Sequence, residues 1–457
     1  MKTIVFVGGT GAQGSAVIKV LSATNEYKIL ALTRSTTSSA AKEIGHLPNV
    51  ELVESKATFG YDVDQYYKAA QRSDYAYINT DGFALGEQAE TYWGIRLFEL
   101  SVRAGVKHLI WSGLDYNGKK TGYDPKFYVG HYEGKARVTE WMRSQPTNPM
   151  GWTVINSGPY IEMLWELLIP ERSNDDVYRF TLPLAQGAIP FVHLEDFGRY
   201  VAWVYSNRAE ANGMVLGISI AHVSGADLAR AFTAATGNRA EYVDAPVAEY
   251  VANRWKHLPK GANTKVGITS VKDENALLMT FGENFTNWWN LYRHSAGNKG
   301  VIQRDYALLD RILPGRVRSA EEWMKKVGYD ATRRTILKSA DRTPPRIASI
   351  CTSYDGGMFT LGFVNDAELV PTEAPPVEVA AVVVLQVKPV QATLALLKAA
   401  AVEVLQVRPV QAKLALHQVA AVEALQVKLA QVKPVQVKLA QVKPVQVKLA
   451  PMQGRCL

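Results

Sequence analysis

The amino terminus joins a short apolar stretch to a cluster of glycines, and this feature limits the folds open to the chain more than any other. Residues 6–17 read FVGGTGAQGSAV, with four glycines in seven residues before a helical pattern begins. Gly8, Gly11 and Gly14 permit a tight turn, the close approach of a pyrophosphate and the close packing of helix on strand, respectively. Free N–H groups at the start of that helix favour phosphate charge. The sequence therefore predicts a dinucleotide-binding unit; the alternative is a glycine-rich turn without a ligand.

Strand-like and helix-like stretches alternate over residues 1–160, which is the pattern of a parallel sheet with helices on both faces. We predict an α/β fold in which residues 1–160 form a Rossmann-type doubly wound parallel sheet, the NAD(P)-binding domain. Residues 161–330 are expected to form a smaller, mainly helical portion that closes over the cofactor end of the sheet and serves a substrate or partner. After the first strand, we expect strands at 28–33, 49–55, 75–79, 106–113 and 151–160, helices at 87–105, 133–144, 224–237 and 319–329, and a strand followed by a helix within 188–207.

The carboxyl-terminal part of the chain has a different composition. Residues 364–457 contain no aromatic residue, and a twenty-residue repeat gives way to two successive copies of LAQVKPVQVK at 429–448. Proline recurs about every ten residues, which prevents long helices, and a segment without aromatic residues has little from which to build a core. We interpret 331–370 as a linker and 371–457 as a low-complexity, disordered repeat tail. The functional alternatives are a basic interaction tail or stacked strand–turn units. We favour the other interpretation, that it is an expanded repeat that packs against nothing or an artefact of the gene model.

Charge is distributed unevenly along the chain. Of the net charge of +8, the tail at 371–457 contributes +6 through 10 basic and 4 acidic residues, so the remaining chain is nearly neutral. This argues against a nucleic-acid-binding domain, and a tail without aromatic residues is a weak candidate for that role. The two cysteines, Cys351 and Cys456, do not form a disulfide or metal framework. No apolar stretch is long enough for a transmembrane helix. We expect no metal site, no membrane partner, and a cytoplasmic or nuclear location.

The dinucleotide type is expected to depend on the end of the second strand. An NAD-selective site usually has an acidic residue about twenty residues beyond the glycines. Here Arg34 occupies that place, twenty residues after Gly14, and the next acidic residue is Glu43. A guanidinium suits a 2′-phosphate, and the hydroxyls of Ser35, Ser38 and Ser39 are candidates to assist it. The sequence therefore favours NADP(H) over NAD(H); the alternative is that Arg34 is an ordinary surface arginine.

Taken together, these motifs resemble the NmrA-like family of atypical short-chain dehydrogenase/reductase relatives. The resemblance is continuous over about residues 1–330 and leaves the tail uncovered. It rests on GGTGAQG (8–14), TRS (33–35), WSGL (111–114), HYEGK (131–135) and SGPYIEML (157–164). The family implies a Rossmann fold with a preference for NADP. Its members are redox or nutrient sensors that bind protein partners, or reductases.

The resemblance also implies positions for the parts of the cofactor. Lys56 departs from the family pattern, which commonly has an acid there, and the run NTDG at 79–82 departs from the more usual TN. The implied contacts are Gly8, Gly9, Thr10, Gly11, Ala12, Gln13 and Gly14 at the pyrophosphate, Arg34 at the 2′-phosphate, Lys56 and Ala57 at the adenine, Thr80 and Asp81 at the inner ribose, Lys135 at the nicotinamide ribose, and Gly158, Pro159, Tyr160 and Ile161 at the nicotinamide.

Catalysis is where the sequence departs most from the wider dehydrogenase pattern. Active short-chain dehydrogenases place a tyrosine four residues before the lysine, so that the lysine lowers the tyrosine pKa for proton transfer. Here His131 stands four residues before Lys135, and Ser112 stands where the helper serine is expected. Histidine can act as an acid or base near neutral pH. His131 is therefore either a catalytic group, together with Lys135 and Ser112, or a structural or binding residue in a site without that chemistry; we favour the second.

Two functions follow from these observations. The favoured one is an NADP(H)-binding regulator that senses redox or nutrient state and acts through a protein partner, because the glycine loop is intact and the Tyr–Lys pair is absent. The alternative is an NADPH-dependent reductase of a small carbonyl or aromatic compound. The aromatic stretches 162–170 and 285–294 are candidates for its pocket, although we favour core packing as the explanation of both.

Overall fold

A computed structural model describes residues 1–57, 59–258, 260–267 and 275–337. The predictions for the tail, and for the linker beyond residue 337, lie outside the described residues. Among the helices that are described, none is long and apolar enough to cross a membrane.

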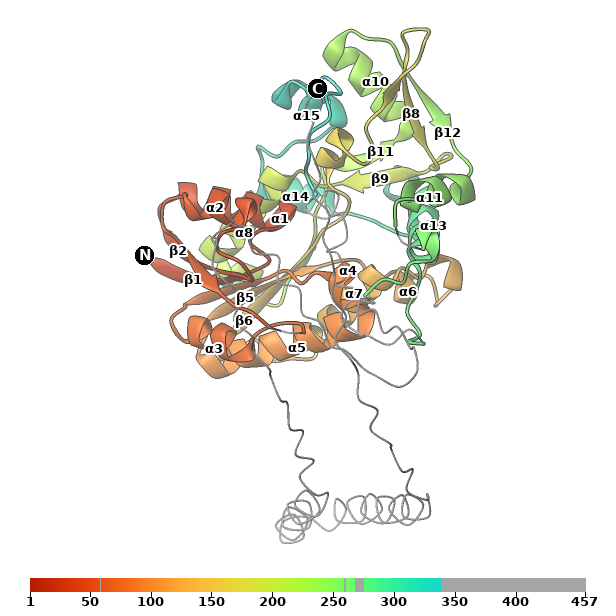
Figure 1. The fold of residues 1–457 in the computed structure, drawn as a ribbon. Coiled ribbons are helices and arrows are strands. Elements are labelled where there is room, and N and C mark those ends of the chain that lie inside the picture. Colours follow the sequence, from red (N-terminus) through yellow and green to blue (C-terminus); the bar gives the residue numbers. More distant parts are fainter. Residues whose placement is uncertain (58, 259, 268–274, 338–457) are drawn as a thin grey trace, which may run out of the picture. The chain divides into compact units, whose positions relative to one another are not determined.

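A seven-stranded parallel sheet forms the centre of the fold (Figure 1), with the strand order β10-β6-β5-β4-β1-β2-β3. The strands are β1 (Lys2–Val7), β2 (Tyr27–Thr33), β3 (Val50–Glu54), β4 (Tyr75–Ile78), β5 (His108–Gly113), β6 (Gly151–Asn156) and β10 (Val215–Gly217). The order reverses at β1, which lies between β2 and β4. Ligands of such sheets bind outside the carboxyl ends of the strands at this reversal. The predicted Rossmann-type fold is confirmed.

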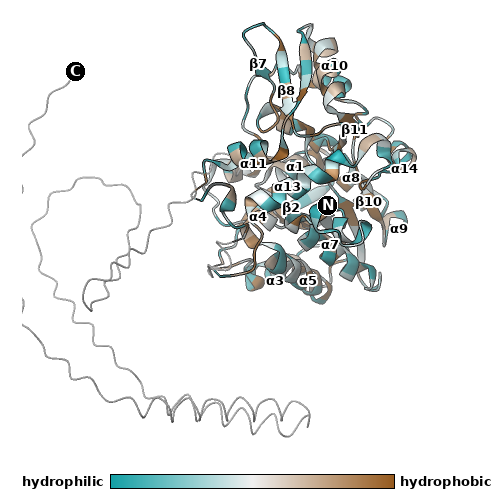
Figure 2. Cartoon of the chain, turned by 90° about the vertical axis from the view of Figure 1, so that its right-hand side faces the viewer, coloured by the Kyte–Doolittle hydropathy of each residue, from teal (hydrophilic) through white to brown (hydrophobic). Residues whose placement is uncertain are grey.

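Both faces of the sheet are buried beneath helices, as expected for parallel strands. In β1, Ile4 and Phe6 join one apolar cluster, while Val5 and Val7 join another, because successive side chains point to opposite faces. Helices α1 (Ala12–Ala23) and α8 (Leu194–Ser206) pack together on the first face. The second face is covered by α3 (Val63–Gln71), α5 (Glu87–Ala104) and α7 (Gly130–Arg143). Hydrophilic and hydrophobic segments are both visible along these helices (Figure 2).

Local sequence signals explain where several helices begin and end. Gly105 ends α5 in the left-handed conformation that glycine adopts without strain. Ser224 starts α10 (Gly225–Thr236) with a reciprocal capping box, in which its side chain and that of Asp227 each satisfy a backbone N–H. Ser319 similarly caps α15 (Ala320–Val327). The short helices near the sheet are α2 (Ser39–Gly45), α4 (Gly82–Leu85), α6 (Asn117–Lys120) and α9 (Arg208–Ala211).

Residues beyond the sheet build a second core around aromatic side chains, which include Trp165, Phe232, Trp289 and Trp323. The further helices here are α11 (Val247–Trp255), α13 (Phe281–Arg293) and α14 (Tyr306–Ile312), with 3-10 turns η1 (Pro125–Phe127), η2 (Ile161–Trp165), η3 (Gly261–Asn263) and η4 (Ala296–Asn298). Two small sheets accompany them: β12-β8-β7, formed by β7 (Glu171–Arg172), β8 (Tyr178–Leu182) and β12 (Ala240–Asp244), and the pair β9 (Ala188–Phe191) with β11 (Ala221–Ser224). These strands of two to five residues are too short to show a clear alternation, and the sequence did not predict the three-stranded sheet.

The sheet layer also takes in residues well beyond the predicted boundary at residue 160. Helix α8 lies against α1, β10 extends the main sheet beside β6, and Leu309 of α14 joins the same apolar cluster. The chain therefore returns to the sheet after leaving it. A boundary drawn at one residue cannot describe this arrangement.

Candidate functional site

The glycine loop after β1 leaves open space where a ligand can reach the backbone. Gly8 has a φ of +84°, and a Cβ atom there would lie 2.4 Å from the carbonyl oxygen of Asn79. A Cβ atom on Gly14 would lie 2.2 Å from the Gly8 carbonyl oxygen, so both positions require glycine. At Gly11, in contrast, a Cβ atom would meet only the Gly8 oxygen, at 3.5 Å. The loop thus has the shape of a phosphate cradle, which a side chain at Gly11 would fill.

Helix α1 adds a favourable charge to this loop. The helix begins at Ala12, directly after Gly11, with neither a capping side chain nor an acidic residue in its first turn. The N–H groups of the first turn of a helix have no partner within the helix and favour an anion. Gly9, Thr10 and Ala12 complete the loop. The residues present therefore fit the pyrophosphate that the sequence predicts here.

Gln13 connects the loop to the ends of neighbouring strands. Its side chain is 3% exposed, and its Oε1 accepts hydrogen bonds from Tyr77 and Ser112, both at 2.7 Å. Its Nε2 lies 3.5 Å from the hydroxyl of Tyr160. The amide therefore points into the protein, and the Ser112 hydroxyl is engaged with Gln13. Tyr77, which sequence reasoning missed, lies within an unbroken apolar strand and offers no polar signal.

Arg34 follows the end of β2 and is exposed. Within the described part of the chain, its guanidinium has no ion-pair or hydrogen-bond partner, so it is available to an anion. The Ser38 hydroxyl caps α2 by accepting from Ala41 N–H at 3.3 Å, and Ser39 is the first residue of that helix. Of these predicted 2′-phosphate contacts, the Ser38 hydroxyl is engaged in capping the helix, whereas the positive charge of Arg34 is not neutralised by an acidic side chain in the described residues.

The predicted adenine and ribose contacts already interact with protein groups. Lys56 is exposed and pairs with Glu54 at 2.9 Å, while its neighbour Ala57 is half-buried. Asp81 caps α4 by accepting from Ala84 N–H at 3.2 Å. Their roles toward a dinucleotide remain predictions.

Lys135 of α7 points toward the end of β4 and is 8% exposed. Its Nζ lies 3.1 Å from Asn79 Oδ1, 3.0 Å from the Thr80 carbonyl oxygen and 3.1 Å from Thr80 Oγ1. Glu90 Oε1 of α5 lies 3.2 Å from the same nitrogen and also accepts from Thr80 Oγ1 at 2.7 Å. Glu90 was missed by sequence reasoning, although a signal exists: it falls on the same helical face as the buried Gly94.

His131 lies one turn before Lys135 within a cluster of rings. Its imidazole centroid is 4.6 Å from that of Phe83 and 5.8 Å from that of Phe285. Its Nδ1 is 2.9 Å from Asn284 Nδ2 on α13. Burial lowers the pKa of His131 to about 4, assisted by the Lys135 charge and opposed by the Asn284 hydrogen bond. The imidazole is therefore neutral at physiological pH, unlike an acid–base group with a pKa near the ordinary value.

The segment Gly158–Ile161, predicted to line the nicotinamide, is fastened to the residues after β9. Val192 N–H donates to the Pro159 carbonyl at 2.8 Å, and Ile161 N–H donates to the Val192 carbonyl at 2.9 Å. A Cβ atom on Gly158 would lie 3.0 Å from the carbonyl oxygen of Pro190. The backbone of this segment is therefore closely held on one side.

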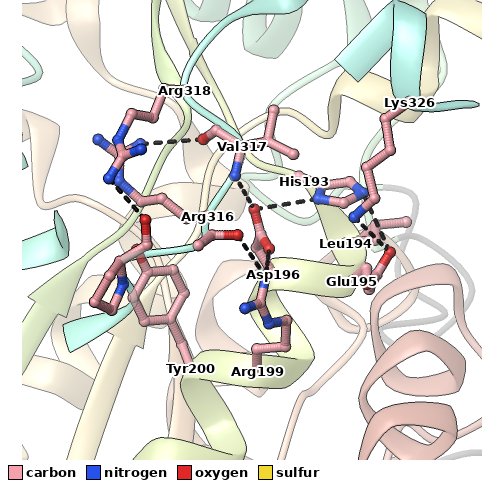
Figure 3. Close-up of polar contacts among 12 residues, drawn as sticks. His193, Leu194, Glu195, Asp196, Arg199, Tyr200, Arg316, Val317, Arg318 and Lys326 are labelled. Atoms are coloured by element: carbon pink, nitrogen blue, oxygen red, sulfur yellow. Dashed lines mark hydrogen bonds and ion pairs between the residues drawn. The ribbon is translucent and has the colours of Figure 1, made fainter. Parts of the chain in front are cut away.

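A buried polar cluster continues from this segment (Figure 3). His193, the cap residue of α8, lies with its Nδ1 3.2 Å from Asp196 Oδ2. Its Nε2 lies 3.8 Å from Glu162 Oε1. Burial raises the pKa of the Glu162 carboxyl to about 7, against the lowering effect of the His193 charge. Asp196 also accepts from Val317 N–H at 2.8 Å. The cluster ties the site segment to residues near the start of α15. Sequence reasoning placed Asp196 at a helix start and Glu162 in the motif 157–164, and did not predict that they lie together.

A second buried contact supports the same segment from another direction. Arg304 forms a bidentate ion pair with Asp115, at 2.7 and 3.2 Å, and donates to the Ser157 carbonyl at 3.2 Å.

No group of three or more histidine, cysteine or acidic side chains in the described residues could hold a metal ion.

Comparison with known proteins places this geometry in context. A model of the NmrA-like family matches residues 1–277. The chain is 25% identical over 262 residues to the NmrA-like family domain-containing oxidoreductase himF of Aspergillus japonicus, covering 53% of this chain and 76% of that protein. It is 22% identical over 342 residues to the similarly named oxidoreductase malD of Malbranchea aurantiaca, covering 71% and 96%.

Solved structures share the fold. One is NmrA, a negative transcriptional regulator, in complex with NADP, with a TM-score of 0.54 and 21% identity over 71% of this chain and 95% of that one. Another is the same regulator in complex with NAD, with a TM-score of 0.55 and 20% identity over 72% and 98%. At this level of identity, the likeness establishes the architecture of the chain.

Proposed function

Since the chain belongs to the NmrA-like family, we propose that it binds NADP(H) at the carboxyl edge of its sheet and regulates a protein partner. The observation that carries the proposal is the open backbone at Gly11, between two glycines that the fold itself requires. Solved relatives in complex with NADP and with NAD support a dinucleotide as the occupant. We place this activity in the cytoplasm or nucleus.

In this proposal, the loop and Arg34 divide the recognition of the cofactor. The N–H groups at the start of α1 hold the pyrophosphate, and the exposed Arg34 guanidinium pairs with the 2′-phosphate that distinguishes NADP from NAD. The segment Gly158–Ile161 lines the nicotinamide end. Because the strands position the backbone of these parts, binding requires little rearrangement.

The groups near the nicotinamide end favour binding over turnover. A bound NADPH supplies a hydride, and reduction of a carbonyl then needs a proton donor. His131 is neutral, lies among aromatic rings and is hydrogen-bonded to Asn284. Lys135 is surrounded by Asn79, Thr80 and Glu90. Neither residue is arranged as the Tyr–Lys pair of an active dehydrogenase, which supports a sensing role.

A second candidate is an NADPH-dependent oxidoreductase, which the names of several relatives favour. The supporting observation in this chain is the set of rings beside His131. Phe83, which is 38% exposed, stacks nearly parallel to Phe285 at 5.9 Å and to Phe281 at 6.1 Å. Flat rings of this kind suit a small aromatic or carbonyl substrate. Trp288 and Trp289, in contrast, belong to the aromatic core.

Titration of the purified full-length protein with NADPH and NADH tests the proposal. We expect saturable binding of both by isothermal titration calorimetry, with NADPH bound more tightly. With a panel of small carbonyl compounds and quinones, NADPH absorbance is expected to decay no faster than without protein. Absence of binding would refute the proposed function. Saturable, protein-dependent NADPH oxidation would establish the oxidoreductase instead.

A further inference from the structure

Resting on the proposed dinucleotide site, we propose that Glu90 is a positioning residue for that site. Its buried carboxylate holds the Lys135 ammonium against Asn79 and Thr80, and these residues support the turn at Gly8. Lys135 then acts on the cofactor loop through β4, and a direct bond to a ribose hydroxyl is not its main role.

The fold makes a dedicated space for the Glu90 carboxylate. The side chain is fully buried, and its Oε1 contacts both Lys135 and Thr80. Its Oε2 lies 2.4 Å from where a Cβ atom on Gly82 would be, and 3.0 Å from the same point on Gly134. Gly82 belongs to the unusual NTDG run and Gly134 to the HYEGK motif. The Glu90 carboxylate, which lies outside both motifs, therefore leaves little room for a side chain at either glycine; at Gly134 the Glu87 carbonyl oxygen, 3.1 Å from the same point, adds to this restriction.

The lysine has no proton left for another partner. An ammonium has three N–H donors, and Nζ of Lys135 already lies within 3.2 Å of oxygen atoms of Asn79, Thr80 and Glu90. A ribose hydroxyl would have to displace one of these oxygens. Burial raises the pKa of the Glu90 carboxyl, and the nearby Lys135 charge opposes this effect by favouring the ionised carboxylate.

The contacts continue from the lysine to the glycine loop. Asn79 N–H donates to the Val7 carbonyl at 3.2 Å, which fixes the end of β4 beside the end of β1. The Asn79 carbonyl oxygen lies 2.4 Å from where a Cβ atom on Gly8 would be. Movement of Asn79 would therefore displace Gly8 and the cradle. Removing only the charge of Glu90 leaves a buried ammonium uncompensated, which is the costly way to break a buried pair.

The test compares Glu90→Gln with Glu87→Gln. Glu87 lies one turn earlier on α5 and pairs with Arg137 of α7, so it is a matched ion pair between the same helices, but a more exposed one. Labelling of the unliganded full-length protein with acetic anhydride, followed by peptide mass spectrometry, reports access to the Lys135 amine. We expect labelling about tenfold faster in Glu90→Gln, and within about twofold of wild type in Glu87→Gln.

Dinucleotide affinity is the second measurement. Glu90→Gln should weaken NADPH and NADH about equally, by roughly tenfold, which corresponds to the loss of a typical charge-assisted contact. Glu87→Gln should leave both unchanged. The shorter Glu90→Asp should not restore affinity, because its carboxylate cannot reach both Lys135 and Thr80. The double variant Glu90→Gln/Lys135→Met removes both buried charges; it should regain the thermal midpoint that Glu90→Gln loses, without regaining affinity.

The outcomes separate this inference from the function on which it rests. Unchanged Lys135 labelling in a folded Glu90→Gln protein, or unchanged affinity, overturns the positioning role. If the single variant does not fold, a stable double variant that binds NADPH as tightly as wild type overturns it as well. Faster labelling in a protein whose wild type binds neither dinucleotide supports the Glu90–Lys135 contact and refutes the proposed function.

Discussion

Replacing Gly11 with alanine should weaken dinucleotide binding strongly while leaving the fold intact. The backbone at Gly11 has φ −85° and ψ 167°, which alanine adopts without strain, and its Cβ atom would have a single neighbour, the Gly8 oxygen at 3.5 Å. A phosphate oxygen hydrogen-bonded to N–H groups approaches to about 2.9 Å, whereas a methyl carbon requires about 3.5–4.0 Å. A methyl group beside these N–H groups would therefore keep the phosphate from closing to hydrogen-bond distance. Weakening one charged hydrogen bond costs about 1.5–3 kcal/mol, or roughly ten- to 150-fold in affinity.

Gly14→Ala is the matched comparison, because its Cβ atom would lie 2.2 Å from the Gly8 oxygen and 2.9 Å from the Gly9 Cα. Backbone atoms cannot move aside cheaply, so this variant should lose about 1–3 kcal/mol of stability or more. Calorimetric titration with NADPH and thermal unfolding of both variants distinguish the two effects. Gly11→Ala with wild-type affinity would refute the assignment of this loop to the pyrophosphate.

Three further predictions concern charge, protonation and the tail. Arg34→Asp should weaken NADPH by about ten- to a hundredfold and NADH by much less; equal losses would refute the 2′-phosphate assignment. In the folded protein, burial lowers the pKa of His131 to about 4, below its ordinary value of about 6.5, so its neutral form contributes stability that is complete above pH 6.5 and is lost as pH falls toward 4. In His131→Phe, the free energy of unfolding should therefore fall less steeply as the pH is lowered across that range. Urea denaturation at several pH values measures this, and a pH dependence equal to that of wild type would contradict the burial argument. Deletion of 371–457 should leave NADPH binding and solubility intact, and loss of either would show that the predicted boundary is wrong.

The sheet and the glycine loop could be predicted because their signals are local. Gly8, Gly11 and Gly14 lie within one turn and the helix that follows it, and the central strands are mainly apolar runs of four to seven residues that end at a glycine or a polar residue. Gly105 and Ser224 mark helix ends for equally local reasons. The two-residue strand β7 has no comparable signal, because its pairing with β8 depends on the packing of the second, aromatic core around it.

The polar network of the site depends on contacts between distant residues. Lys135 is 45 residues from Glu90 in the sequence, and His131 is 153 residues from Asn284. No spacing rule relates such pairs: the helix of Glu90 was predicted from its apolar periodicity alone, and the helix of Asn284 was not predicted. A charged residue at a buried helical position, such as Glu90, is the one available signal. It indicates that a partner exists, without identifying it.

These distant partners determine what the recognisable motif can do. The residues of HYEGK retain the lysine and the helical position that a dehydrogenase would use, yet Glu90 and Thr80 occupy the ammonium, while Asn284 and Phe83 surround the imidazole. Restoring tyrosine at residue 131 would therefore place a phenol beside a lysine whose protons are already committed. The glycine cradle depends on backbone shape alone and does not share this constraint. Cofactor binding depends on the backbone of the glycine loop, whereas proton transfer depends on the side chains around residues 131 and 135. The same fold can therefore bind a cofactor without catalysing a dehydrogenase reaction.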